Sequence, residues 1–480
     1  MIGDWRSHAD YKKFMIERIN REFSHNRNSI HYFETALLKM NHLDLDNVIE
    51  DFIPLFSSTG RPSHQQPELF RSFLLMSHFK YASIDEWVAY ASSSNIICAL
   101  VGVEPFRFPG ASTHRDFIHR LWQTEKPNRL KKRKTKSSKK HGKNKIPPKN
   151  PGIVHYLVEK ALSGQVFQDI PERILQTIFM KTAVIPSISL GLINDIDKLI
   201  VSADGTCISS NASPYGHKVC KCKGKCLCNK SFADPLAKWG WDSYHERYFY
   251  GYTAYLLSVH NKELKLDLPI YIKFVEAQRS DSVTLIPALA HARYLYKEIL
   301  TIDSIVADAI HDNYPTYRLL DQWNIKPFIP LNDRSDNKLQ PKGTFLSQEG
   351  VPVCADGHNM TYWGYEAKKS RCKYRCPLIA SNKVTYCPYD TNCNKTLYGK
   401  IVYVRRASNL RLITPVPRGS KQWKDIYKQR TASERVNNRI LTDYQLEQPK
   451  RYGKAKLAFF AFFNAINIHL DALIRHSSTG

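Results

Sequence analysis

Three acidic residues stand at positions from which their carboxylates could meet. Asp204 and Asp308 each end an apolar, β-branched run, residues 197–204 and 302–308, and Glu434 lies in the helical pattern of residues 423–444. Taken singly, each acid could be an ordinary surface or capping residue. Carboxylates brought together repel one another without cations, and their oxygens suit Mg²⁺, which also binds substrate phosphates. The joint placement therefore predicts a site for divalent metal ions, Mg²⁺ or Mn²⁺ in its place.

The elements around these acids predict an α/β fold. Strand patterns at residues 197–204, 248–259 and 268–275 precede a helical pattern at 283–296 and a strand at 302–308. A helix at 314–323 and a short strand at 326–330 follow. The order is strand, strand, strand, helix, strand, with acids ending the first and fourth strands. A helix packed across such a sheet would add Glu434.

The helix that carries Glu434 presents several polar residues on one face. Steps of three, four and seven residues return to nearly the same side of a helix, which groups Tyr427, Arg430 and Glu434 with Leu441. Arg430 is then one turn from Glu434 and can grip the same phosphate. Trp423 lies one turn before Tyr427, and Arg435 is a further candidate cation.

Charge makes nucleic acid the leading partner. The 480 residues carry a formal net charge of +26, which a polyanion would neutralise. The Lys-rich stretch at 124–152 has almost no apolar residues, so we expect a solvated linker. It is either an inert tether or an arm that contacts DNA phosphates, and we favour the arm. Its most basic run includes Lys131, Lys132, Arg133 and Lys134.

The flanking regions predict a helical start and an apolar final helix. Residues 11–122 show helical spacing, with Ser83 as a helix start before Trp87. The late stretch 457–474 carries polar residues and reads as a buried helix rather than a membrane span. The first residues do not have the order of a signal peptide, so we expect a cytoplasmic protein with reduced or metal-bound cysteines.

Two groups of cysteines are candidate zinc ligands. The first is compact and comprises Cys220, Cys222, Cys226 and Cys228. The second lies in a polar, partly β stretch at 332–420 and comprises Cys372, Cys376, Cys387 and Cys393, with Cys354 as an alternate member. Four thiolates can close a tetrahedral zinc site. For each group, the alternative is a set of reduced thiols without metal.

The motifs around the acids resemble those of the DDE transposases of bacterial insertion sequences. They are Ser-Ala-Asp-Gly-Thr at 202–206, Ala-Asp-Ala-Ile-His-Asp at 307–312, and Tyr-x2-Arg-x3-Glu from Tyr427 to Glu434. Ile310 and His311 depart from the family's Asp-x-Gly-Tyr-Asp, and Leu441 replaces its usual Lys; Arg435 or Arg439 could supply that charge. The helical N-terminal pattern, with Gly-Arg-Pro at 60–62 and Ser-Thr-His-Arg-Asp-Phe at 112–117, resembles the domain that precedes the family's catalytic core.

The resemblance implies a ribonuclease H-like core, a mixed sheet flanked by helices, with Asp204, Asp308 and Glu434 as catalytic metal ligands and Asp312 in support. Two metal ions would act in cleaving element ends and joining them to target DNA. The resemblance also makes Trp423 and Tyr427 candidates for stacking on a flipped base, with core residues as the alternative. The expected partner is double-stranded DNA, bound by a homodimer in the bacterial nucleoid, with no membrane. A structure-selective nuclease on the same fold and a non-catalytic DNA-binding regulator are the alternatives.

The expected organisation has an all-α N-terminal DNA-binding domain and a Cys-bearing insertion. The ranges are 1–123 for the helical domain, 124–152 for the linker, 153–331 for the first part of the core, 332–420 for the insertion and 421–480 for the C-terminal helices.

Overall fold

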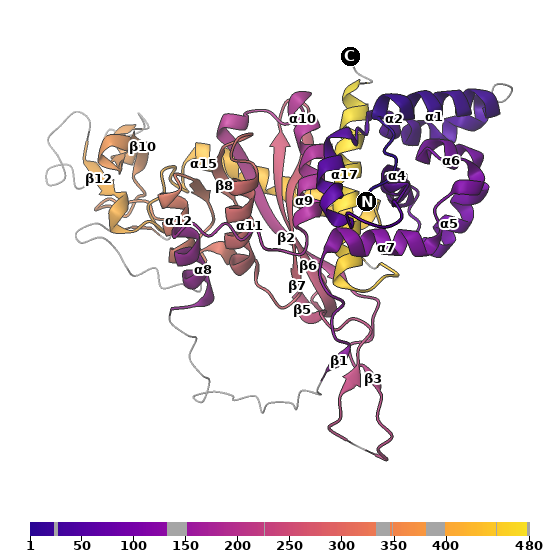
Figure 1. Ribbon diagram of the computed structural model, residues 1–480. Coiled ribbons are helices and arrows are strands. Elements are labelled where there is room, and N and C mark those ends of the chain that lie inside the picture. Colours follow the sequence, from indigo (N-terminus) through magenta and orange to yellow (C-terminus); the bar gives the residue numbers. More distant parts are fainter. Residues whose placement is uncertain are drawn as a thin grey trace.

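The computed structural model describes residues 1–23, 27–131, 151–224, 226–332, 346, 347, 349–380, 399–447 and 449–477. A six-stranded mixed sheet forms its centre, in the order β5-β6-β2-β8-β9, with β7 paired to β6 (Figure 1). β8 is parallel to β2 and β9, whereas β6 is antiparallel to its neighbours. The strands are β2 (Leu199–Ser209), β5 (Lys238–Asp242), β6 (Arg247–Asn261), β7 (Leu266–Glu276), β8 (Ile302–Val306) and β9 (Lys326–Phe328). The α/β prediction is confirmed.

The strand predictions are confirmed except at two points. β2 does not end on Asp204 but continues to Ser209, because Thr206 and Ile208 extend its pairing with β6. That pairing needs a glycine at position 251, where a Cβ would lie 2.1 Å from the carbonyl oxygen of Ile208. β5, which carries Trp239 and Trp241, was not predicted as a strand.

Helices pack across the sheet and carry the remaining predicted site residues. α11 (Asp281–Leu295) follows β7, and α12 (Tyr314–Gln322) follows β8. The helical stretch predicted at 423–444 consists of α15 (Lys421–Tyr427), η11 (Lys428–Arg430), α16 (Thr431–Asn438) and the π-helical η12 (Arg439–Asp443). Before β2 lie α8 (Ile153–Leu162), α9 (Arg173–Phe179), η6 (Met180–Val184) and α10 (Ile185–Ser189).

The N-terminal region is helical, as predicted. Its main helices are α1 (His8–Phe23), α2 (Glu34–His42), α3 (Ile49–Phe52), α4 (Gln66–His78), α5 (Ile84–Ser93), α6 (Asn95–Val101) and α7 (Ala111–Trp122). The Ser83 hydroxyl accepts a hydrogen bond from the Glu86 backbone and caps α5, confirming that helix start. Trp87, one turn later, is fully buried.

The last helix, α17 (Lys454–Ser477), joins the N-terminal helices to the sheet (Figure 1). Phe459 and Phe463 contact Phe73 of α4, while the His469 ring bonds the Pro269 carbonyl of β7 at 2.7 Å. α17 is long and apolar enough to cross a membrane, but 89% of its most apolar window is buried inside the protein. It is the buried helix predicted from the sequence, and one hydrophobic core runs through it from the N-terminal helices to the sheet.

Two smaller sheets lie outside the centre. β10 (Thr361–Glu366), β11 (Arg371–Arg375) and β12 (Ile401–Arg405) form an antiparallel sheet with its own small core, in the region predicted as a partly β insertion. β1 (Leu130–Lys131), β4 (Lys230–Ser231) and β3 (His217–Lys218) form the other, on a hairpin that projects from the body (Figure 1). Residues 130 and 131, at the start of the predicted linker, pair with β4, and Leu130 remains exposed. Residues 132–150 of the linker lie outside the described residues.

Candidate active site

Asp204 lies in the middle of β2, between β6 and β8. Its Oδ2 accepts a hydrogen bond of 2.9 Å from the Asn437 side chain on α16. Burial raises the pKa of Asp204 to about 7, with further contributions from the charges of Asp281 and Asp308, and Arg430 opposes the shift. The carboxyl group therefore sits among other acids and gains by sharing a proton or a cation.

Asp308 follows β8 and is held by a buried histidine. Its Oδ1 is 2.6 Å from Nδ1 of His311, whose Nε2 is 2.8 Å from the hydroxyl of Tyr255 on β6. An ionised carboxylate only accepts hydrogen bonds, so Nδ1 carries the proton. Burial would raise the pKa of Asp308, but the hydrogen bond and charge of His311, with smaller contributions that include Arg430, hold it below its usual value.

Glu434 lies on α16 and is partly exposed. Its Oε1 pairs with the Arg430 guanidinium at 2.5 Å, and 45% of its side chain is exposed. The Ser202 hydroxyl of β2 donates to the Ser433 hydroxyl at 2.6 Å, which fixes α16 across the sheet beside Asp204. Asp308 and Glu434 are thus both partly open to solvent, whereas Asp204 lies deeper in the sheet.

Arg430 is the common neighbour of the three predicted acids. It pairs with Glu434, and its charge lowers the pKa of both Asp204 and Asp308. Tyr427 is half-buried beside the same group: burial raises its pKa, and the charges of Asp308 and Glu434 raise it further. Arg430 therefore links Asp204, Asp308 and Glu434, with Tyr427 beside the last two. The three carboxylates do not form a group at metal-ligand spacing in the described residues, and their chemical roles stay a prediction.

A fourth acid, Asp281, was not singled out in the sequence. It begins α11, and a Cβ added at Gly205 would lie 2.5 Å and 2.7 Å from its two carboxylate oxygens. Burial and the charge of Asp308 raise the pKa of Asp281 to about 6, against the opposing charge of His311. In the sequence, an acid at a helix start is indistinguishable from one that complements the helix dipole. The glycine at position 205, next to Asp204, is the one sequence feature related to this contact, because a side chain at that position would displace Asp281.

Other predicted site residues have structural partners. Asp312 is buried, and its two oxygens pair with the Arg411 guanidinium at 2.8 Å and 2.6 Å. Trp423 is 7% exposed and packs with Val306 and Phe328, which favours the core alternative over base stacking. Its ring stacks on Tyr427, with centroids 4.7 Å apart.

A groove lies beside Glu434. It has a volume of about 410 Å³ and is lined by four cations, Lys265, Arg435, Arg439 and Arg475, together with Leu266, Asp267, Thr431, Glu434 and Asn438. Arg435 pairs with Asp267, and Arg439 pairs with Asp471. These pairings fix both arginines on the groove wall, so neither side chain extends freely toward the place of the Lys that Leu441 replaces.

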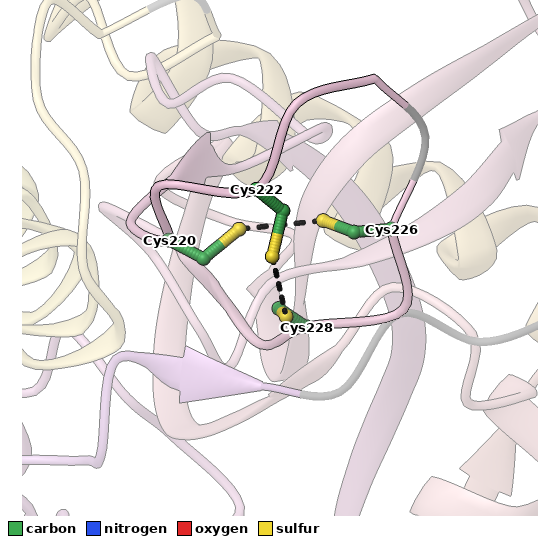
Figure 2. Close-up of side chains that lie close together, drawn as sticks. All are labelled: Cys220, Cys222, Cys226 and Cys228. Carbon is green, nitrogen blue, oxygen red and sulfur yellow. Dashed lines mark hydrogen bonds between the residues drawn. The ribbon is translucent and has the colours of Figure 1, made fainter.

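The four cysteine side chains of the first group lie close together, as Figure 2 shows. The ligand atoms of Cys220, Cys222, Cys226 and Cys228 all lie within 4.8 Å of one another, which is compatible with a structural metal ion. Within the described ranges, this is the one cluster of His, Cys, Asp or Glu side chains with metal-site spacing.

The second cysteine group is only partly described. Cys387 and Cys393 lie outside the described residues. The thiol of Cys372 is fully buried in the small core of the insertion and donates to the Thr414 carbonyl at 3.5 Å. Cys354 and Cys376 are half-buried. Zinc binding by this group stays a prediction.

Comparison with known proteins gave one family match, in the C-terminal part of the chain. Residues 353–473 match the family model of the transposase DDE domain. The match contains Glu434, Arg430 and the described part of the insertion sheet, whereas Asp204 and Asp308 precede it. A search of curated proteins gave no match. The match spans 121 of the 480 residues and supports the resemblance to DDE-type transposases drawn from the motifs.

Proposed function

We propose that this chain is a transposase that cuts DNA at the ends of an insertion sequence and joins them to target DNA, with Asp204, Asp308 and Glu434 as ligands of two divalent metal ions. One observation carries the proposal: Arg430 neighbours all three acids, although they come from β2, the end of β8 and α16. A structural role alone would not require three separated elements to deliver carboxylates to one arginine.

The residues present fit Mg²⁺. The charges of Asp281 and Asp308 act on Asp204, the charge of Asp308 acts on Asp281, and Arg430 pairs with Glu434. Burial and these neighbouring charges raise the pKa of Asp204 and Asp281, so a cation bound among them would favour the ionised carboxylates, and it would draw the acids closer than they lie in this structure. Mg²⁺ takes oxygen ligands and retains positions for water and phosphate oxygens. When bound, the paired ions would stabilise the attacking and leaving oxygens of an in-line displacement.

The surrounding side chains have supporting roles in this proposal. His311 and Asn437 hold the orientations of Asp308 and Asp204 through single hydrogen bonds. Arg430 and the cationic wall of the groove beside Glu434 would hold DNA phosphates. Asp312, through its pair with Arg411, would fix the segment after Asp308 against the insertion. Asp281 would serve as a fourth carboxylate that shares a metal ion or proton with Asp204.

The fold supports a ribonuclease H-like core. The central sheet is mixed, with one strand, β6, antiparallel to its neighbours, and α11, α12 and α16 pack against it. The proposed setting is the bacterial cytoplasm, at the nucleoid, with a homodimer bound to element ends and target DNA. A structural zinc ion on Cys220, Cys222, Cys226 and Cys228 is part of this proposal.

The test uses the full-length protein and duplexes that carry the ends flanking its own gene. Mg²⁺-dependent release of a 3′-hydroxyl and its transfer to a second duplex are the expected products. Cutting without joining would indicate a structure-selective nuclease. Binding without either reaction, unchanged by replacing the three acids, would indicate a non-catalytic regulator.

A further inference from the structure

We propose that zinc bound by Cys220, Cys222, Cys226 and Cys228 orders the projecting hairpin into a surface that contacts the phosphates of duplex DNA. The inference gives the cysteine site a role separate from the carboxylate site. It concerns DNA affinity, so it does not rest on the chemistry proposed for Asp204, Asp308 and Glu434.

The thiol geometry suits a tetrahedral ion. Cys220 Sγ and Cys226 Sγ are 3.3 Å apart, and Cys222 Sγ and Cys228 Sγ are 3.7 Å apart. A zinc ion with Zn–S bonds of about 2.3 Å holds its sulfurs about 3.8 Å from one another. A disulfide would require about 2.05 Å. Figure 2 shows the four sulfurs turned toward a common centre from the two sides of the loop.

Apart from a bound metal ion, the hairpin has few interactions that would stabilise it. Its two strands, β3 and β4, contain two residues each, and its large apolar side chains, Tyr215, Val219 and Leu227, are all more than half exposed. A segment that buries so little apolar surface needs another source of order. Metal binding can supply it, because the free energy of binding four thiolates to one ion contributes to folding.

The same segment is strongly basic. Five lysines and no acid occur between Tyr215 and Ser231. Lys218 Nζ donates to the carbonyl oxygens of Cys222 and Gly224 and braces the turn, whereas Lys221 and Lys223 are exposed. A zinc ion with four thiolates keeps a net charge of −2, which these lysines more than offset. The hairpin therefore presents positive charge outward.

Strand β1 extends this surface. Leu130 and Lys131 pair with Ser231 and Lys230, and the Arg129 carbonyl accepts a hydrogen bond of 3.0 Å from the Phe232 backbone. Arg129 and Lys131 are thereby held beside the lysines of the hairpin. Cations aligned along a projecting element, with little acid among them, fit the DNA backbone, because each phosphate contact releases counterions.

Zinc content tests the first half of the proposal. Full-length protein purified without chelators should contain zinc, and Cys220→Ser/Cys226→Ser should contain one equivalent less. Cys207→Ser, which removes a thiol outside both cysteine groups, should keep the wild-type content. Trypsin should cut the Cys220→Ser/Cys226→Ser hairpin faster than the wild-type hairpin. Equal zinc in wild type and double variant, or a disulfide in this loop, would overturn the metal site.

DNA affinity without Mg²⁺ tests the second half. The probe is a fluorescent duplex of arbitrary sequence, so that neither cleavage nor end recognition contributes. Lys221→Ala/Lys223→Ala should retain zinc, weaken binding several-fold and reduce the slope of log affinity against log salt by up to about 1.8, at about 0.9 per phosphate contact. The double cysteine variant should lose at least as much affinity. Zinc loss with unchanged affinity and salt slope would refute the DNA surface, while leaving the catalytic proposal untouched.

Discussion

The carboxylate site and the cysteine hairpin both gather metal-binding side chains, but by different means. Asp204, Asp281, Asp308 and Glu434 come from four elements that the core positions independently of any ion. The four cysteines fall within nine consecutive residues of a loop with hardly any core. In the first site the fold positions the proposed ligands, and a bound cation would relieve the repulsion between their charges. In the second site the metal would assemble the fold.

This difference predicts opposite responses to perturbation. Loss of metal from the carboxylate site should abolish chemistry and leave the structure intact. Loss of metal from the hairpin should disorder the hairpin and leave the sheet intact. Each prediction below tests one side of this contrast.

Replacing one of the acids should have the largest effect. Asp204→Ala, Asp308→Ala or Glu434→Gln removes a metal ligand, and losing a preorganised group that stabilises charge costs about 10²–10³ in rate. End cleavage in Mg²⁺ should fall at least that far, while duplex binding and zinc content remain. Asp303→Asn, on β8 but paired with Lys326, is the matched control and should cleave normally. Near wild-type cleavage by any of the three acid variants would remove that acid from the catalytic set.

Removing the histidine behind Asp308 should have the next largest effect. His311→Ala leaves Asp308 without its orienting donor, and outer partners of metal ligands contribute about 10–100-fold to metal affinity or activity. The Mg²⁺ concentration for half-maximal cleavage should rise by that factor. His311→Asn, which can still donate near the Nδ1 position, should recover part of the loss. A rate loss without any change in Mg²⁺ dependence would show that the histidine is merely structural.

Stability should depend on pH through Asp204. Its pKa of about 7 in the fold exceeds the usual 3.8, so the folded state binds more protons than the unfolded state between these values. The stability of the metal-free protein should therefore fall as pH rises from about 4 to about 7. Asp204→Asn should raise the Tm by several degrees at pH 8 and less at pH 5. If the variant is no more stable than wild type at pH 8, the ionised Asp204 carboxylate does not destabilise the fold, and the prediction is wrong.

The smallest effect is expected at the groove wall. Arg435→Gln breaks an exposed ion pair with Asp267, and such pairs contribute about 0–1 kcal/mol to stability. The Tm should hardly move, whereas affinity for element ends should fall less than tenfold with a shallower salt dependence. Asp267→Asn, which frees the arginine, should not weaken binding. Equal losses from both variants would assign the pair a structural role only.

Much of the sheet could be predicted because its strands are nearly continuous apolar runs. β6 and β7 are buried along most of their length, so composition alone marks them as strands. The end of β2 could not be predicted, because polar residues after Asp204 still pair with β6. The pairing of β1 with β4 was equally hidden, since two residues in a Lys-rich stretch have no strand pattern of their own.

The candidate site was predictable where chemistry and spacing coincide, as in Arg430 and Glu434 one helical turn apart. Asp281 was missed because its neighbourhood is created by the packing of α11 on β2, which no local pattern records. His311 was visible only as a departure from a motif, although its two hydrogen bonds explain why a histidine serves there. The cysteine group, in contrast, could be predicted from the sequence alone, because its four candidate ligands are close together along the chain.

Helix α17 has a consequence for how the protein is made. Phe459 and Phe463 fill the space around Phe73 of α4, and His469 closes against β7, so neither the N-terminal helices nor the sheet has a complete core until the last helix has been synthesised. During translation, the apolar surfaces of both regions stay exposed until α17 is available to cover them. Exposed apolar surface of this kind promotes aggregation. A chain whose synthesis stops before residue 454 would leave the cores of both regions incomplete. The functions proposed for the N-terminal helices and for the sheet therefore depend on the same helix.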